Sequence, residues 1–129
     1  MPEWVIEGSA IHGIDDFYAQ LNRLLMAGED WELGPSLDAL NDVLWGGIGA
    51  MQGQQRVRFV WRDHAASRRA LGRQATEEWL RSKAAQPQTF NAQAIHGQLR
   101  ELRAGTGPSY FDLILQVFAD HSNVELVLS

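Results

Sequence analysis

The chain of 129 residues contains no cysteine, which excludes disulfide bonds, thiolate metal ligands and thiol nucleophiles. It also lacks any run approaching the ~20 apolar residues that a membrane-spanning helix requires. Its first residues, MPEWVIEGSAIHG, show neither the basic start nor the apolar run of a secretory signal peptide. We therefore expect a cytoplasmic protein that does not associate with membranes. Apolar residues make up 45% of the sequence, which fits one globular domain over residues 1–129.

Residue patterns typical of enzymes and metal centres are missing as well. No Gly-rich phosphate-binding motif and no Gly-x-Ser-x-Gly nucleophile motif occurs. The two Asp-His pairs, 63–64 and 120–121, are sequence neighbours whose side chains would point about 100° apart on a helix, which is a poor arrangement for acid–base catalysis. No two histidines have the spacing that places two metal ligands on one helix face. The histidines are His12, His64, His96 and His121. We expect no catalysis, no cofactor and no metal site.

Charge is distributed unevenly along the chain, whose net charge is −5. Residues 1–54 hold nine acidic residues and one arginine, a net of −8, whereas residues 55–104 hold ten basic and four acidic residues, a net of +6. Residues 105–129 add three acidic residues and no basic one. Such segregation produces a field that steers a charged partner, although solvated helices of differing sign would give the same pattern. The acidic end suits a cationic partner and the basic middle permits an acidic one. Charge alone therefore does not identify the kind of partner.

The arginines Arg62, Arg68, Arg69 and Arg73 allow an interpretation as a nucleic-acid contact. Only Arg69 and Arg73 share a helix face at the i,i+4 spacing, however, and nucleic-acid-binding domains usually have a basic balance, whereas this chain is acidic. The other interpretation is a solvated surface that balances the acidic end. We expect no direct contact with nucleic acid.

Three stretches have the composition of strands, at residues 3–8, 56–61 and 124–129. The middle one, RVRFVW, is a nearly unbroken apolar run that suits a strand covered on both faces, and the last, VELVLS, predicts a buried closing strand. Helical patterns lie between them, including one from an Asp63 cap to Gly72, two over 75–86 and 91–105 separated by PQTF, and one over 110–123. Strands separated by helices predict an α/β fold with a small three-stranded parallel sheet covered by helices.

The stretch SLDALNDVLWGG, residues 36–47, predicts a short amphipathic helix with Ser36 as its N-cap. Its apolar stripe comprises Leu37, Leu40, Val43 and Leu44. Asp38, Asp42 and Trp45 share the opposite face. Like charges at the i,i+4 spacing cost a helix roughly 0.2–0.5 kcal/mol, and only Asp38, in the first turn, gains from the helix dipole. An aromatic residue beside unneutralised carboxylates is typical of a surface that binds a cationic protein, although an ordinary polar face with a Trp tucked under a loop would have the same sequence.

Four blocks of the sequence decide between these two interpretations. LGPSLDALNDVL is similar to a Gly-x-Asn-Leu-Asp-Ala-Leu-Trp-Asp-x-Leu motif, and VIEGSAIHGIDDFYAQL, RVRFVWRDHAASRRALG and ILQVFADHSNVELVLS add similar strands and helices in the same order. With these blocks the chain resembles the barstar family of intracellular ribonuclease inhibitors over about two-thirds of its length. The first block is the specific one, since the others are hydrophobic patterns.

The resemblance implies which residues would bind a partner. Asp38 and Asp42 match the two aspartates of the motif, and Asp120 falls on an acidic position of the family's last helix. In the family these carboxylates enter the active site of a barnase-like ribonuclease and take the place of substrate phosphates, with Asp42 as the central anchor. The neighbouring positions that would border the contact are Glu32, Ser36, Asn41, Trp45 and Gly46.

The chain departs from the family pattern at several of these positions. The motif's Trp is Asn41 here, its Asn is Ser36, a loop Tyr position is Glu32, and a later Trp position is Gly47. Trp31 and Trp45 lie nearby in sequence and could supply aromatic contacts. Residues of about 73 to 110 have no counterpart in the smallest family members and would add one or two helices.

We therefore expect a barstar-like inhibitor, antitoxin or immunity protein that binds a cationic barnase-like ribonuclease or nuclease toxin. The alternative is a non-inhibitory protein-interaction module that kept this fold, with the insertion binding another protein or a second copy of the chain. The sequence leaves open whether the protein forms a homo-oligomer.

Overall fold

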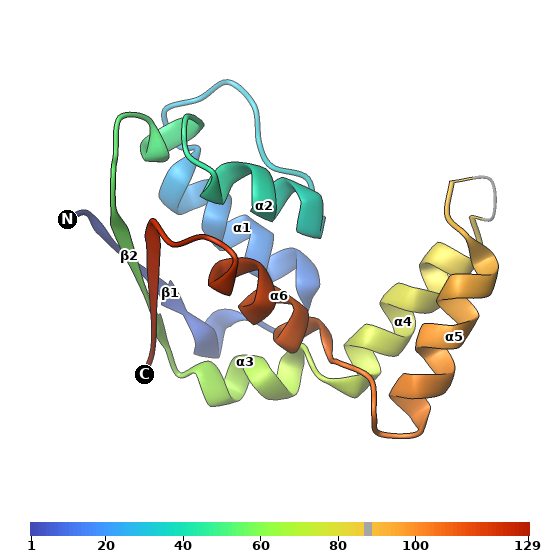
Figure 1. Ribbon diagram of the computed structural model, residues 1–129. Helices are drawn as coiled ribbons and strands as arrows, with labels where there is room; N and C mark the ends of the chain where they lie inside the picture. Colours follow the sequence, from blue (N-terminus) through green and yellow to red (C-terminus); the bar gives the residue numbers. More distant parts are fainter. Residues whose placement is uncertain (87–88) are drawn as a thin grey trace.

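Three parallel strands lie side by side at one end of the structure, and helices pack next to them (Figure 1). The computed structural model describes residues 1–86 and 89–129. The strands are β1 (Glu3–Glu7), β2 (Val57–Arg62) and β3 (Val124–Leu128). The helices are α1 (Ile14–Leu25), α2 (Leu37–Leu44), α3 (His64–Ala70), α4 (Arg73–Ala84), α5 (Ala92–Arg103) and α6 (Tyr110–Ala119), with short 3-10 turns η1 (Gly8–Ala10) and η2 (Gly49–Met51). Within the described ranges, no helix has the length and apolar character needed to cross a bilayer.

The sheet has the strand order β1-β2-β3, and both pairs are parallel, so the predicted α/β fold with a three-stranded parallel sheet is confirmed. The prediction that β2 is covered on both faces is wrong. Its residues alternate between buried Val57, Phe59 and Trp61 and the less buried Arg58, Val60 and Arg62. Helices α1, α2 and α6 lie on the side of the buried set (Figure 1). An apolar run therefore need not mean two covered faces, because valine also occurs on the more open side of a sheet.

The closing strand β3 also differs from the prediction, since it is not buried. Val127 and Leu128 are 37% and 38% exposed. The reason is topological: β3 pairs only with β2 and forms one edge of the sheet, so its outer side has no neighbouring strand among the described residues.

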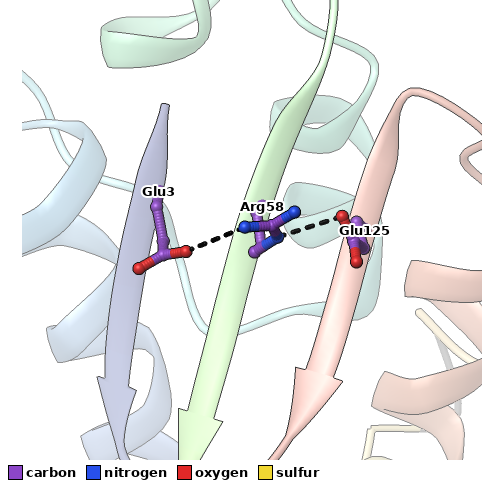
Figure 2. A network of polar contacts seen from close by, with 3 residues as sticks. All are labelled: Glu3, Arg58 and Glu125. Carbon is purple, nitrogen blue, oxygen red and sulfur yellow. Dashed lines mark hydrogen bonds and ion pairs between the residues drawn. The ribbon is translucent and has the colours of Figure 1, made fainter. Parts of the chain in front are cut away.

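The more open face of the sheet is tied together by a charged row across the three strands. Arg58 lies directly opposite Glu3 and Glu125 in the strand register. Its guanidinium donates to both carboxylates, at 3.3 Å and 3.0 Å, as Figure 2 shows. The hydrogen bond to Glu125, and then the one to Glu3, raise the pKa of Arg58 above its ordinary value. Exposed pairs of this kind add little stability but penalise a shifted register.

Two predictions about helix ends are wrong: the side-chain cap at the start of α3, which follows β2, and the end of α6, which precedes β3. Asp63 precedes α3, but its backbone is left-handed, with φ of 50°, and its side chain makes no capping hydrogen bond. Gly8 passes so close to the Arg62 and Asp63 carbonyls that a Cβ there would clash with them. Helix α6 ends at Ala119 instead of continuing to residue 123, because the chain turns after Asp120 to enter β3.

The segment of residues 73–110 forms two helices, α4 and α5, which pack on each other as a hairpin set apart from the sheet (Figure 1). The hairpin has a small core of its own, made of Leu80, Ile95, Leu99 and Leu102. Of the predicted connection at 87–90, the first two residues lie outside the described part. Thr76 joins the hairpin to the rest of the protein: its hydroxyl donates to the Gly72 carbonyl and accepts from the Tyr110 N–H, both at 2.7 Å.

The only two tyrosines of the chain meet inside the protein. The hydroxyls of Tyr18 on α1 and Tyr110 on α6 lie 2.7 Å apart, and both side chains are buried. Burial raises the pKa of both phenols, because the charged form would lose its hydration.

This pair predicts how the protein unfolds at high pH. The unfolded tyrosines ionise near pH 10, whereas the folded state holds them neutral, so stability is complete below about pH 10 and falls as the pH rises further. We expect tyrosinate ultraviolet absorbance to appear only together with loss of circular dichroism, well above pH 10. Ionisation of either tyrosine near pH 10 with the circular dichroism unchanged would contradict the buried pair.

Candidate functional site: the acidic face of α2

Helix α2 forms where the sequence predicts it, and its two ends are well defined. The Ser36 hydroxyl accepts a hydrogen bond of 3.0 Å from the Ala39 N–H, as expected of an N-cap. At the other end, Gly46 and Gly47 adopt φ angles of 96° and 82°, which glycine reaches without strain and which end the helix. The buried stripe of Leu40, Val43 and Leu44 packs in the main core, and α2 lies against α6.

The opposite face of α2 carries Asp38, Asp42 and Trp45, and all three side chains are exposed. The predicted division of this helix into a core face and an outward face is therefore confirmed. Trp45 is 71% exposed, more than any other large hydrophobic residue that the structure describes. In residues 1–86 and 89–129, neither aspartate forms an ion pair. The carboxylates are thus available to a cation from outside the chain.

Asp120 reaches the same region from the end of α6. It is the C-cap residue of that helix and is exposed. The next residue, His121, forms a hydrogen bond of 2.8 Å from Nε2 to Asn41 Oδ1 on α2. Asn123 Nδ2 donates to the Leu44 carbonyl at 3.1 Å. These two bonds hold the turn after α6 beside the C-terminal half of α2.

His121 is the residue of this region that sequence reasoning missed. Its ring is buried and meets the Trp45 ring edge-on, with 5.0 Å between the centroids. Nδ1 of His121 is buried and has no hydrogen-bond partner among the described residues. The available signal was Asn41 itself: a polar residue beside the apolar stripe of a helix needs a hydrogen-bond partner when it is partly buried. Sequence alone does not say which residue supplies it.

Two further residues predicted from the sequence, Gly46 and Glu32, lie outside helix α2. Gly46 follows Trp45 in the turn after α2. Glu32 is exposed on the loop that leads into α2. That loop is fixed by Asn22 of α1, whose side-chain amide donates to the Leu33 carbonyl at 3.2 Å and accepts from the Leu33 N–H at 2.7 Å. No hydrogen bond or ion pair in the described part of the chain joins Glu32 to the α2 residues.

Asp38 in the first turn of α2 gains from the helix dipole, whereas Asp42 and Asp120 bring little benefit to the fold. Asp42 lies in the middle of α2, one turn from Asp38, so the two charges repel each other. Asp120 lies at the C-terminal end of α6, where the helix dipole disfavours a negative charge. By contrast, Asp112 in the first turn of α6 has a structural role, since it completes a capping box with Ser109. We call the exposed set of Asp38, Asp42, Trp45 and Asp120 the acidic face.

Other chemistries find less support in the described residues. They include no group of three or more His, Asp or Glu side chains arranged to hold a metal ion. Three of the arginines in 62–73 make contacts within the chain: Arg62 pairs with Glu7 at 3.7 Å, Arg68 lies over the Phe111 ring at 4.8 Å, and Arg73 donates to the Arg103 carbonyl at 2.9 Å.

No protein-family model matches this chain, and no curated protein sequence matches it. The resemblance to barstars therefore depends on the motif around α2 and on the order of the blocks described above.

The position of each carboxylate predicts its effect on stability. Asp42→Ala should raise the free energy of unfolding by about 0.5 kcal/mol, because it removes a repulsion and places a better helix former in mid-helix. Asp120→Ala should raise it by about 0.3–1 kcal/mol. Asp112→Ala should lower it by about 1 kcal/mol, because the capping box is lost. Denaturant unfolding at low ionic strength measures all three. A loss above about 1 kcal/mol at Asp42 would mean that its carboxylate holds the fold.

Proposed function

We propose that the protein is a barstar-like inhibitor of a cationic ribonuclease, acting as an antitoxin or immunity protein. The observation that carries this proposal is the acidic face: carboxylates from α2 and from the end of α6, exposed, without ion pairs in the described chain, and arranged around the most exposed tryptophan. The motif that contains Asp38 and Asp42 supports the same conclusion from the sequence.

The physical basis is mimicry of a nucleic-acid backbone. A ribonuclease must gather Lys, Arg and His side chains to hold the phosphates of RNA. Carboxylates on a rigid protein surface can occupy those sites, form charge-assisted hydrogen bonds and exclude the substrate. The net of −8 over residues 1–54 would also accelerate encounter with a cationic partner. Inhibition would be stoichiometric occlusion, with no bond made or broken.

The rigidity of the acidic face supports a tight complex. The Ser36 cap, the Asn41–His121 bond and the Asn123–Leu44 bond fix α2 and the turn after α6 in the free protein. Little backbone freedom would then be lost on binding, which is the main way in which preorganisation raises affinity.

Trp45 would provide the apolar centre of the contact. Tryptophan is one of the residues enriched among binding hot spots. The family motif has a Trp at the position of Asn41, whereas here Asn41 binds His121 and the ring of His121 supports Trp45. We infer that Trp45 replaces the aromatic contact that the family obtains from elsewhere in the motif.

The proposal is tested by titrating this protein into a panel of barnase-like ribonucleases and measuring RNA cleavage. One equivalent of the protein should inhibit at least one of these ribonucleases. Asp42→Ala should raise the Kd by at least about thirtyfold, or 2 kcal/mol, since it would leave buried cations of the nuclease without a partner. The matched control is Glu101→Ala, which removes an exposed carboxylate of α5 and should leave the Kd unchanged.

The outcome that would overturn the proposal is absence of binding across the panel, or an equal effect of both variants. The alternative, a protein-interaction module with this fold, would be favoured if the protein formed a stable homodimer that Asp42→Ala or Trp45→Ala dissociated.

A further inference from the structure

A cleft of about 800 Å³ opens between the α4–α5 hairpin and the body of the protein. One wall is α4, with Gln74, Glu78, Trp79 and Ser82, and the other is the start of α1, with Asp15 and Asp16. Arg69 and Ala70 at the end of α3 and Pro35 before α2 also line it. The hairpin is needed for this cleft, because its helix α4 supplies one side of the lining.

The two adjacent glutamates of α4, Glu77 and Glu78, differ in whether the protein itself neutralises them. Glu77 is neutralised within the hairpin, since it pairs with Arg103 at 2.7 Å and with Arg81 at 3.6 Å. Glu78, the next residue, is exposed in the cleft and forms no ion pair in the described part of the chain. Across the cleft, Asp15 is likewise exposed and unpaired within those residues. The described lining holds three carboxylates, Asp15, Asp16 and Glu78, against one arginine, Arg69, and one histidine, His12. This negative balance suits a cationic group.

One residue of the cleft lies next to helix α2. Pro35 directly precedes the N-cap of α2. Lys83, one turn beyond Trp79 on α4, has its ammonium over the Trp79 and Phe90 rings at 4.1 Å and 5.1 Å. Burial lowers the pKa of Lys83, and the negative charge of Asp38 opposes that shift.

The wall formed by α4 is fixed in place. Trp79 packs edge-on against Tyr110 of α6, with 4.8 Å between the ring centroids, and contacts both hydrophobic cores. Together with the two hydrogen bonds of Thr76, this contact fixes the base of the hairpin.

Interface size gives a reason for the cleft to take part in binding. A stable complex usually buries about 800 Å² on each partner. Helix α2 has eight residues and spans only about 12 Å, so its outward face is too small to supply that area. The contact must therefore extend beyond α2, and Pro35, which lines the cleft, directly precedes the N-cap of this helix.

We propose that the cleft receives a second, lysine- or arginine-containing segment of the same ribonuclease whose active site meets the acidic face. The inference rests on the proposed function, and it assigns the hairpin as a second binding element that holds the nuclease from the side of α4. Glu78 and Asp15 are the residues that would meet the basic segment.

The test measures the Kd of a ribonuclease that the wild-type protein inhibits. Glu78→Arg should weaken binding roughly tenfold or more, and Ser82→Trp, which fills the cleft without changing charge, should also weaken it. The matched control is Glu101→Arg, the same charge reversal on α5 outside the cleft, which should change the Kd less than twofold. Circular dichroism and melting temperature verify that each variant folds.

The outcomes separate the two proposals. If Asp42→Ala abolishes binding while Glu78→Arg and Ser82→Trp leave it unchanged, the cleft is not used and the inhibitor proposal stands. If no ribonuclease binds, both proposals fail. A free protein that sediments as a dimer, and becomes a monomer on Glu78→Arg, would show that the cleft holds a second copy and would overturn the inference.

Discussion

Trp61 lies in the central strand and contacts elements from the whole length of the chain. Its ring stacks on Phe17 of α1 at 5.2 Å and packs against Phe111 of α6 at 5.1 Å. Its indole N–H donates to Ser67 of α3 at 3.0 Å, and Ser67 in turn donates to the Gly8 carbonyl at 2.9 Å. A small sheet with one well-covered face has few positions for a large side chain, so burying this one fixes three helices relative to the strands. The polar end of Trp61 is satisfied in the same arrangement, which makes a shifted packing costly.

The arrangement around Trp61 also decides what the surface can do. Because α6 is fixed on the sheet, the turn that follows it must pass beside α2, and the Asn41–His121 bond forms there. The acidic face therefore combines residues that are far apart in the sequence but rigidly joined in space. Asp42 repels Asp38, and Asp120 opposes the dipole of α6. Locally unfavourable charges of this kind are typical of functional sites.

The α4–α5 hairpin adds a second, smaller core to this body. It is joined to the first through Trp79 and Thr76, so its position is determined by packing rather than by a flexible linker. Its consequence is a concave surface beside an otherwise convex helix. In the proposed complex, α2 would enter the active site of the ribonuclease. The neighbouring wall formed by α4 would then help to determine which ribonuclease binds.

The sequence by itself determined the periodic features: the helix at 36–47 with its Ser36 cap and outward carboxylates, the three strands and their parallel pairing, and the two helices of the hairpin. These follow from local spacing and from propensity, which act over a few residues. The predicted burial of β2 and β3 was wrong, because burial of a strand depends on what packs against each of its faces. The predicted end of α6 was also wrong, because the chain turns there to enter β3. Only the tertiary structure decided that His121 contacts Asn41 and Trp45, and that Glu78 and Asp15 line one cleft. Those relations join residues 63 or more positions apart, and sequence periodicity has no reach over such separations.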